Sequence, residues 1–207
     1  MVPQETVEEK DLRVWVTNNA KPSNHVAHAV SKANQLLGLI KRTFSYMDSD
    51  LMRLLFTSVI RPHLEYTNVV WHPFLRIDID LIERVQHRAT KMVPSLSRLP
   101  YEERLKKMNM PSLFYRRIRG DVIEAYKYLH GVYDTDSTDL LPLYETRGMQ
   151  TRGNTLKLQK RDCRTQLRQN FFSMRIVNIR NKLPEEIVQA PSFNCLKGRF
   201  DRYSVSN

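Results

Sequence analysis

Apolar residues recur every three or four positions along most of this chain, which is the spacing of one face of an α-helix. The pattern predicts helices over 23–46, 51–71, 78–92, 101–108, 112–131, 171–183 and 192–200. Alternation of apolar and polar residues predicts short strands over 12–17 and 155–160. The predicted fold class is therefore mainly α: a helical bundle, followed by a smaller helical C-terminal region with a short strand or hairpin.

The first long helix is expected to begin after Pro22, with Ser23 as its N-cap. Its apolar positions form one narrow stripe, which should pack against other helices: Val26, Val30, Ala33, Leu37, Ile40 and Phe44. Gly38 lies inside this helix at a cost of about 1 kcal/mol relative to alanine. We expect Gly38 to mark the close approach of a neighbouring helix or backbone.

The helix over 78–92 has two distinct faces. The face expected to enter the core carries Leu81, Ile82, Val85, Ala89 and Met92. The neighbouring face is positive and carries Arg84, His87, Arg88 and Lys91. Since contacts to a nucleic-acid backbone need positive residues on one face, Arg84, Arg88 and Lys91 are candidate phosphate contacts. Upstream, Pro62 is expected to begin a second half-helix, because proline fits a first helical turn.

The helix over 112–131 should end at Gly131, since glycine favours the conformation that terminates a helix. Its expected buried face consists of Ile118, Val122, Ala125 and Leu129. Arg116 and Arg117 lie on the charged side, where two interpretations stay open. They belong either to a solvated face partly paired with Asp121 and Glu124, or to a set of phosphate contacts. We expect the C-terminal helices to pack on this long helix.

A long connection over 132–153 marks a boundary between the bundle over 23–131 and a basic region over 154–207. Ten positive residues lie between positions 147 and 182, against Asp162 alone. Candidate nucleic-acid contacts in this region are Lys160, Arg161, Arg164, Arg168 and Arg175. For Phe171 and Phe172 we favour core packing over stacking on bases.

The composition favours a polyanionic partner. The 207 residues carry a formal net charge of +11, and the pI is about 9.8. We expect this partner to be nucleic acid and not a membrane, because no apolar run approaches the roughly 18–20 residues that span a bilayer.

The polar, acidic start is not a secretory signal, and two cysteines indicate a reducing compartment, so we expect an intracellular location, cytoplasmic or nuclear. No metal or cofactor is expected, since His25 and His28 have no third ligand nearby.

Four motifs occupy the middle of the chain. They are RPHLEYxxxVWxP at 61–73, DIxLIExVQxRATK at 78–91, YEERL at 101–105 and SLxYRRIRGDxIExYKxLxG at 112–131. They resemble the region after the palm in the RNA-directed DNA polymerase (reverse transcriptase) of non-LTR, jockey-like (LINE-type) retrotransposons. The resemblance extends upstream through 9–16 and 21–44, and downstream through 151–160, 168–178 and 183–194. It therefore covers nearly the whole chain.

This resemblance implies that each segment of the chain corresponds to a region of the reverse transcriptase. Residues 1–22 correspond to a remnant of the palm exit strand and its linker, so the strand over 12–17 should lack partners. The bundle over 23–131 corresponds to the thumb and the helices after it, and a thumb lies along the template-primer duplex. The chain departs from the family at Arg180, where related elements tend to have an aromatic residue. If that aromatic packs inward, the tail of this chain should be weakened.

The carboxylates that a polymerase needs are not evident in the sequence. Reverse transcriptases hold two divalent metals with carboxylates that include an adjacent Asp-Asp pair, and no Asp-Asp occurs here. The spaced pairs are Asp48 with Asp50, Asp78 with Asp80, and Asp134 with Asp136, and we expect the first two to cap helices. Phosphate-loop, nucleophile-elbow and His-Glu-x-x-His motifs are also missing. We therefore expect no catalytic residues and no enzyme activity.

Three functional hypotheses remain. The leading one is a truncated C-terminal fragment of a retrotransposon reverse transcriptase. This fragment binds the backbone of RNA, of DNA or of an RNA–DNA hybrid, and it does not polymerise. The alternative is a domesticated helical module that recruits a protein partner through an apolar face of its bundle. The third is a subunit that a palm domain completes in trans. Backbone binding should weaken steeply with salt, whereas an apolar interface should respond little.

Overall fold

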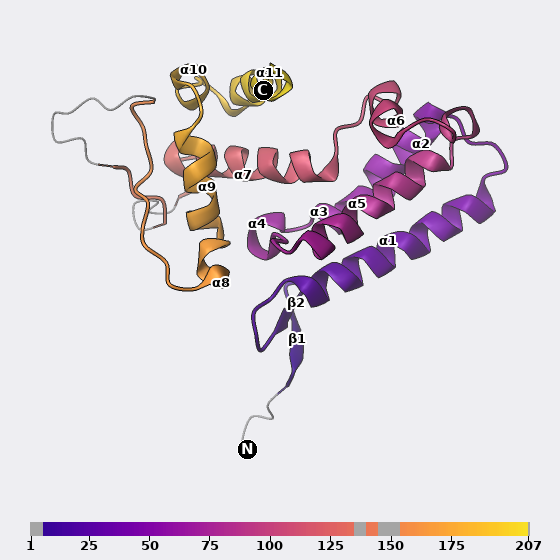
Figure 1. Cartoon of the computed structure of the whole chain (residues 1–207), viewed down its shortest axis with the longest axis horizontal. Helices are drawn as coiled ribbons and strands as arrows, with labels where there is room; N and C mark the ends of the chain where they lie inside the picture. Colours follow the sequence, from indigo (N-terminus) through magenta and orange to yellow (C-terminus); the bar gives the residue numbers. More distant parts are fainter. Residues whose placement is uncertain (1–5, 135–139, 145–153, 207) are drawn as a thin grey trace. The chain divides into compact units, whose positions relative to one another are not determined.

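The chain folds mainly into helices, as the sequence predicts. The computed structural model describes residues 6–134, 140–144 and 154–206 (Figure 1). Two compact units are formed, Met1–Arg117 and Ile118–Asn207. The division falls inside helix α7 (Leu113–Leu129), whereas the sequence placed a boundary at 132–153.

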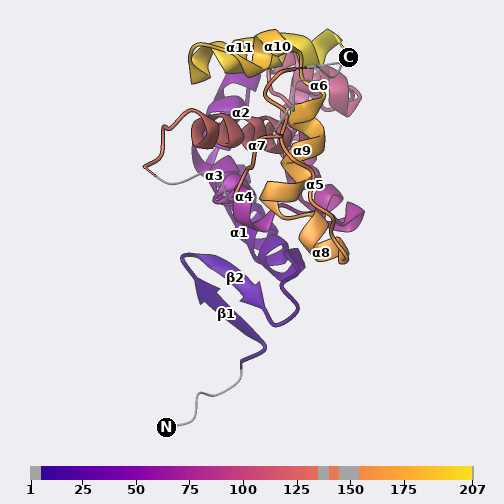
Figure 2. The same cartoon turned by 90° about the vertical axis from the view of Figure 1, so that its left-hand side faces the viewer.

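The first unit begins with an antiparallel hairpin of β1 (Glu8–Asp11) and β2 (Val14–Thr17), which Figure 2 shows beside the start of α1. The expectation of a strand without a partner is therefore wrong. The reason is that β1 has the polar sequence EEKD and is exposed along its whole length, so no apolar alternation marks it. Leu12 and Arg13 form the two-residue turn, with φ of 43° and 69°.

The core of this unit lies between α1 (Ser23–Thr43) and α5 (Arg76–Lys91). The stripe predicted for α1 is buried from Val26 to Ile40, and the predicted inward face of α5 is buried at Ile82, Val85 and Ala89. Both results reflect helical periodicity, because each helix has one apolar face and buries it.

Three details of α1 differ from the sequence prediction. Pro22 takes the N-cap position, and Ser23 Oγ instead donates to Asp78 Oδ2 over 2.7 Å, which links α1 to α5. Phe44 lies just past the end of the helix and is exposed. A Cβ at Gly38 would meet only Arg42 Nη1, at 3.8 Å, so no described neighbouring helix approaches closely there.

Between these helices lie α2 (Ser49–Leu55), a π-helical turn (Phe56–Ile60), α3 (Arg61–Glu65) and α4 (Asn68–Trp71). The buried residues are spaced by four: Met52, Phe56, Ile60 and Leu64. On an α-helix, positions four apart rotate by about 40° at each step, and the wider π turn offsets this rotation. Leu54 and Val59 of the same stretch are exposed. Pro62 lies early in α3, as predicted.

Glu83 of α5 organises the start of α7. After a 3₁₀ turn (Pro94–Leu96) and α6 (Tyr101–Lys107), the chain enters α7. The Glu83 carboxylate accepts the backbone N–H of Leu113 (3.3 Å) and Phe114 (3.1 Å), and the hydroxyl of Tyr101 (2.5 Å). Burial and this bond to Glu83 raise the pKa of Tyr101. Glu83 therefore caps a helix from a distant position in the sequence.

The second unit contains the remainder of α7 with α8 (Gln166–Gln169), α9 (Phe172–Asn181), α10 (Glu185–Val188) and α11 (Phe193–Ser206). The Tyr126 hydroxyl donates to the Ala190 carbonyl over 2.8 Å, and Arg119 pairs with Asp201 at 2.6 Å. These bonds confirm that the C-terminal helices pack on the long helix. The strand predicted over 155–160 is reduced to one bridge, between Leu143 and Leu158.

Replacing Glu83 with alanine should destabilise the first unit by about 2–3 kcal/mol, because two helix-start amides and a partly buried hydroxyl lose their acceptor. Urea unfolding measures the change. Glu9→Ala is the matched control, since Glu9 is exposed on β1, and its effect should stay within about 0.5 kcal/mol. Equal effects of the two substitutions would contradict the capping role.

Candidate nucleic-acid interface

The outer face of α5 carries the clearest group of exposed cations. Arg84, Arg88 and Lys91 are all exposed, and none forms an ion pair with another residue that the structure describes. The reason is local, because Ile82, Val85 and Ala89 turn into the core and leave these three on the solvent side. The helix therefore has the predicted arrangement, with an apolar face in the core and a positive face beside it.

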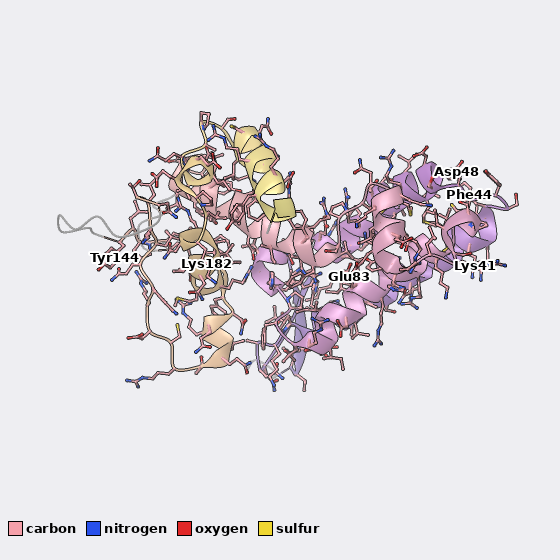
Figure 3. The ribbon with its side chains drawn as sticks, turned by 45° about the horizontal axis from the view of Figure 1, so that its top comes forward. Lys41, Phe44, Asp48, Glu83, Tyr144 and Lys182 are labelled. Atoms are coloured by element: carbon pink, nitrogen blue, oxygen red, sulfur yellow. The ribbon has the colours of Figure 1, made fainter. Side chains whose placement is uncertain are left out.

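A hollow of about 590 Å³ extends this face toward α1. Arg88 and Lys91 line it from α5, and Lys41 lines it from the end of α1, where Figure 3 labels Lys41 and Phe44. The apolar part of its lining comes from Leu37, Phe44, Met47, Met92 and Pro94. No carboxylate of the described residues lines it, so its rim is positive. Lys41 was missed from sequence because the pairing of α1 with α5 cannot be read from either helix alone.

His87 does not add to this charge, although it has the same helical spacing. Its ring stacks on Tyr101, with centroids 4.3 Å apart, and its carbonyl accepts from buried Arg104 over 2.9 Å. Burial, together with the positive charges of Arg104 and Lys91, lowers the pKa of His87. Near neutral pH this imidazole is therefore uncharged.

Of the two α7 arginines proposed from sequence, Arg116 is half-buried in an ion pair and Arg117 is buried. Arg116 makes a two-pronged ion pair with Glu65, through Nε (2.5 Å) and Nη2 (2.8 Å). Arg117 is only 2% exposed. Periodicity could not predict these two environments, because spacing alone does not distinguish an arginine that pairs or packs inside from a solvated one. Neither side chain joins the α5 face as a surface cation.

Arg175, in the second unit, is likewise held inside. Its guanidinium pairs with Asp121 through two bonds of 2.9 Å and donates to the Asn170 carbonyl over 3.0 Å. Asp121 is fully buried on α7, on the face that the sequence interpreted as charged and outward. This pair joins α7 to α9, so the structure gives Arg175 a stabilising contact and not a surface position.

The other four candidates of the basic region are exposed: Lys160, Arg161, Arg164 and Arg168. The Arg168 guanidinium lies over the ring of Phe171, with 5.2 Å to its centroid, and Phe171 is 43% exposed. Phe172 is buried, so core packing holds for Phe172 and not for Phe171. This segment presents cations beside one accessible aromatic ring.

Arg180, where the chain departs from the resembled family, is 4% exposed. Its guanidinium donates to the Leu156 carbonyl, and burial lowers its pKa to about 10. Asn154 Nδ2 donates to the carbonyls of Arg180 (3.1 Å) and Leu183 (3.0 Å). An inward arginine is therefore accommodated by hydrogen bonds from the chain around it.

The acidic pairs have structural contacts. Asp48 caps α2 by accepting the Leu51 N–H over 2.8 Å, as predicted. Asp78 does not cap α5 but accepts from Ser23, and Asp80 pairs with Arg76 at 3.0 Å. Asp136 lies outside the described residues. Among those described, no three His, Cys, Asp or Glu side chains gather as metal ligands would, and no helix has the length and apolar character to cross a membrane.

Comparisons with protein-family models, with curated proteins and with solved structures give no match to this chain.

Replacing Arg175 with alanine should destabilise the second unit by about 3–5 kcal/mol, because fully buried Asp121 loses both charge-assisted bonds that it accepts from Arg175. Hydrogen exchange of the α9 amides measures this locally. Arg164→Ala removes the same charge from an exposed position and should leave protection nearly unchanged. Equal protection in both variants would contradict the internal role of Arg175.

Proposed function

We propose that this chain is the C-terminal, thumb-containing part of a non-LTR retrotransposon reverse transcriptase. In this proposal it contacts the backbone of RNA or DNA and has no polymerase activity of its own. The family part of the proposal rests on the motifs over 61–73, 78–91, 101–105 and 112–131. The binding part rests on one observation, the exposed row of Arg84, Arg88 and Lys91 on α5.

The row suits a phosphate backbone in length and charge. Seven residues separate its ends, which is about 10 Å along an α-helix. One strand of B-DNA presents about three phosphates over that length, at about 3.4 Å each along the axis. Since the three cations make no ion pair with a described residue, binding would not have to break one. Such contacts position a duplex without reading its sequence.

Lys41 and the apolar hollow beside α5 extend the same surface. A cation across the hollow allows a second point of contact, and the apolar floor between them brings no carboxylate that would repel phosphate. The exposed cations Lys160, Arg161, Arg164 and Arg168 supply a separate basic segment, which we propose as a secondary contact for single-stranded nucleic acid beside Phe171.

The non-catalytic part of the proposal rests on the sequence, which contains no adjacent aspartate pair. A two-metal mechanism needs carboxylates that converge on both ions. The aspartates of the spaced pairs Asp48/Asp50 and Asp78/Asp80 instead take part in a helix cap, a tertiary hydrogen bond and ion pairs within a helix.

A salt titration of binding to an RNA–DNA hybrid tests the binding surface. Arg84→Ala/Arg88→Ala/Lys91→Ala should lower the slope of log affinity against log salt by about 2–3, since each lost phosphate contact removes nearly one unit. For wild type, these three contacts alone account for about a 40-fold loss of affinity between 50 and 200 mM salt. Fluorescence anisotropy with a labelled hybrid measures both quantities.

The matched control is Arg98→Ala/Lys106→Ala/Lys107→Ala, which removes the same charge from exposed positions of the same unit. It should keep most of the wild-type slope. If both triple variants lose the slope equally, net charge and not the α5 row drives binding. Salt-insensitive binding would favour the protein-recruitment module, and nucleotide incorporation on a primer-template with magnesium would contradict the non-catalytic proposal.

A further inference from the structure

Gly38 lies in the middle of α1, where no described neighbouring helix approaches closely. Glycine inside a helix is less stabilising than alanine, and a Cβ at this position would meet only the Nη1 atom of Arg42, at 3.8 Å. Gly38 lines the hollow of about 590 Å³ beside α5, which we call the α1–α5 hollow. The missing side chain therefore leaves this part of the hollow open.

The floor of the α1–α5 hollow is apolar and contains an accessible aromatic ring. Phe44 is 37% exposed, and the other apolar residues of the lining are Leu37, Met47, Met92 and Pro94. A hollow of this size falls in the range of small-molecule sites, which are mostly apolar with a few polar groups. An exposed phenylalanine offers a stacking face to a flat ring, and a nucleobase is the flat ring that nucleic acid brings.

The cations of the rim come from two different helices. Lys41 lines the hollow from the end of α1, and Arg88 and Lys91 line it from α5, with no carboxylate among the described residues of the lining. A single phosphate would require all three cations to meet at one point. A nucleic-acid strand does not, because it carries a phosphate on each side of a nucleoside, so separate cations contact separate phosphates. The rim and the floor together suit one nucleotide of a strand.

The segment that carries Phe44 is fixed at both ends. The Phe44 N–H donates to the Ile40 carbonyl over 3.1 Å, which ties the residue to the last turn of α1. At the other end Met47 is buried, and the Asp48 carboxylate caps α2 by accepting the Leu51 N–H over 2.8 Å. The ring is thus presented by a short segment between two helices, so binding a base requires little ordering of the chain.

We propose that the α1–α5 hollow holds one unpaired nucleotide of the nucleic acid that lies on the α5 row. Its base stacks on Phe44 in the space left by Gly38, with one flanking phosphate toward Lys41 and the other toward Arg88 and Lys91. The inference rests on the proposed function, because Arg88 and Lys91 belong to the α5 row. An acidic peptide with an aromatic side chain has a similar mix of groups, but a strand bound along the row already reaches the hollow.

The test compares RNA–DNA hybrids that differ by one nucleotide. A blunt hybrid is compared with hybrids that carry one unpaired deoxyadenosine at the 3′ or the 5′ end of the DNA strand. The same overhangs with an abasic nucleotide add the phosphate without the base. Fluorescence anisotropy with the full chain at one fixed salt concentration measures each affinity. For wild type we expect one of the two deoxyadenosine overhangs to bind about tenfold more tightly than its abasic counterpart, a typical gain for a base stacked on an aromatic ring.

Two substitutions in the hollow should abolish this gain. Phe44→Ala removes the stacking face, and Gly38→Leu fills the space for the base, so both should lower the affinity ratio of overhang to abasic hybrid to about one. Leucine favours a helix more than glycine does, and no close atom obstructs a Cβ at position 38, so Gly38→Leu should raise the Tm by a few degrees. A gain that is lost in a more stable chain is not the result of a damaged fold.

Tyr46→Ala is the matched control, because Tyr46 is an exposed aromatic residue of the same segment that does not line the hollow. It should keep the tenfold ratio. The inference is overturned if neither overhang binds more tightly than its abasic counterpart, if Gly38→Leu keeps the gain, or if Tyr46→Ala loses it. It is also overturned if an acidic peptide with a tryptophan binds in a way that depends on Phe44 and no unpaired nucleotide does.

Failure of this inference and failure of the proposed function give different results. If the overhangs bring no gain while binding to the blunt hybrid still depends on salt and on the α5 row, only the nucleotide site in the hollow is contradicted. If no hybrid binds with a salt dependence that Arg84→Ala/Arg88→Ala/Lys91→Ala lowers, both the inference and the proposed function are contradicted.

Discussion

The contact between α1 and α5 is the constraint on which the first unit depends. Ile82, Val85 and Ala89 are fully buried in it, so the rotation of α5 about its own axis is fixed by the core. Because side chains at intervals of three and four share a face, Arg84, Arg88 and Lys91 must then point to solvent together. The proposed binding surface is thus a consequence of core packing. A helix that rotated by one residue would expose apolar side chains and bury the cations.

The distribution of the positive charges separates two physical roles. The cations of the α5 row and of 160–168 are exposed, whereas Arg116 and Arg175 form two-pronged pairs with Glu65 and Asp121, and Arg117 is buried. A net charge of +11 therefore overstates the charge available to a partner at any one face. Arginine suits the internal role because its planar fork matches a carboxylate in two bonds and it keeps its charge when buried.

Periodicity predicted the parts of the fold that depend on local pattern and missed those that depend on distant partners. The inward faces of α1 and α5 were predicted, as was the end of α7 before Gly131, whose φ is 62°. The strand β1 was missed because its four residues are all polar. The cap that Glu83 provides for α7 joins positions thirty residues apart, and no spacing rule within one helix can show it.

The candidate sites divide in the same way. The α5 row could be predicted because exposure is the complement of a buried apolar face. Lys41 and the hollow that it lines could not, since both depend on which elements lie beside α1. Asp121 and Arg175 were misplaced for a related reason: a buried ion pair breaks the rule that charge marks the outside of a helix.

The most direct test of the central claim is an NMR titration of the arginine Nε–H resonances of the labelled chain with an unlabelled RNA–DNA hybrid. The account predicts that the resonances of Arg84 and Arg88 shift first and furthest, while those of Arg116 and Arg175, already bound to carboxylates, stay in place. Shifts at Arg116 and Arg175 with none at Arg84 and Arg88 would contradict it.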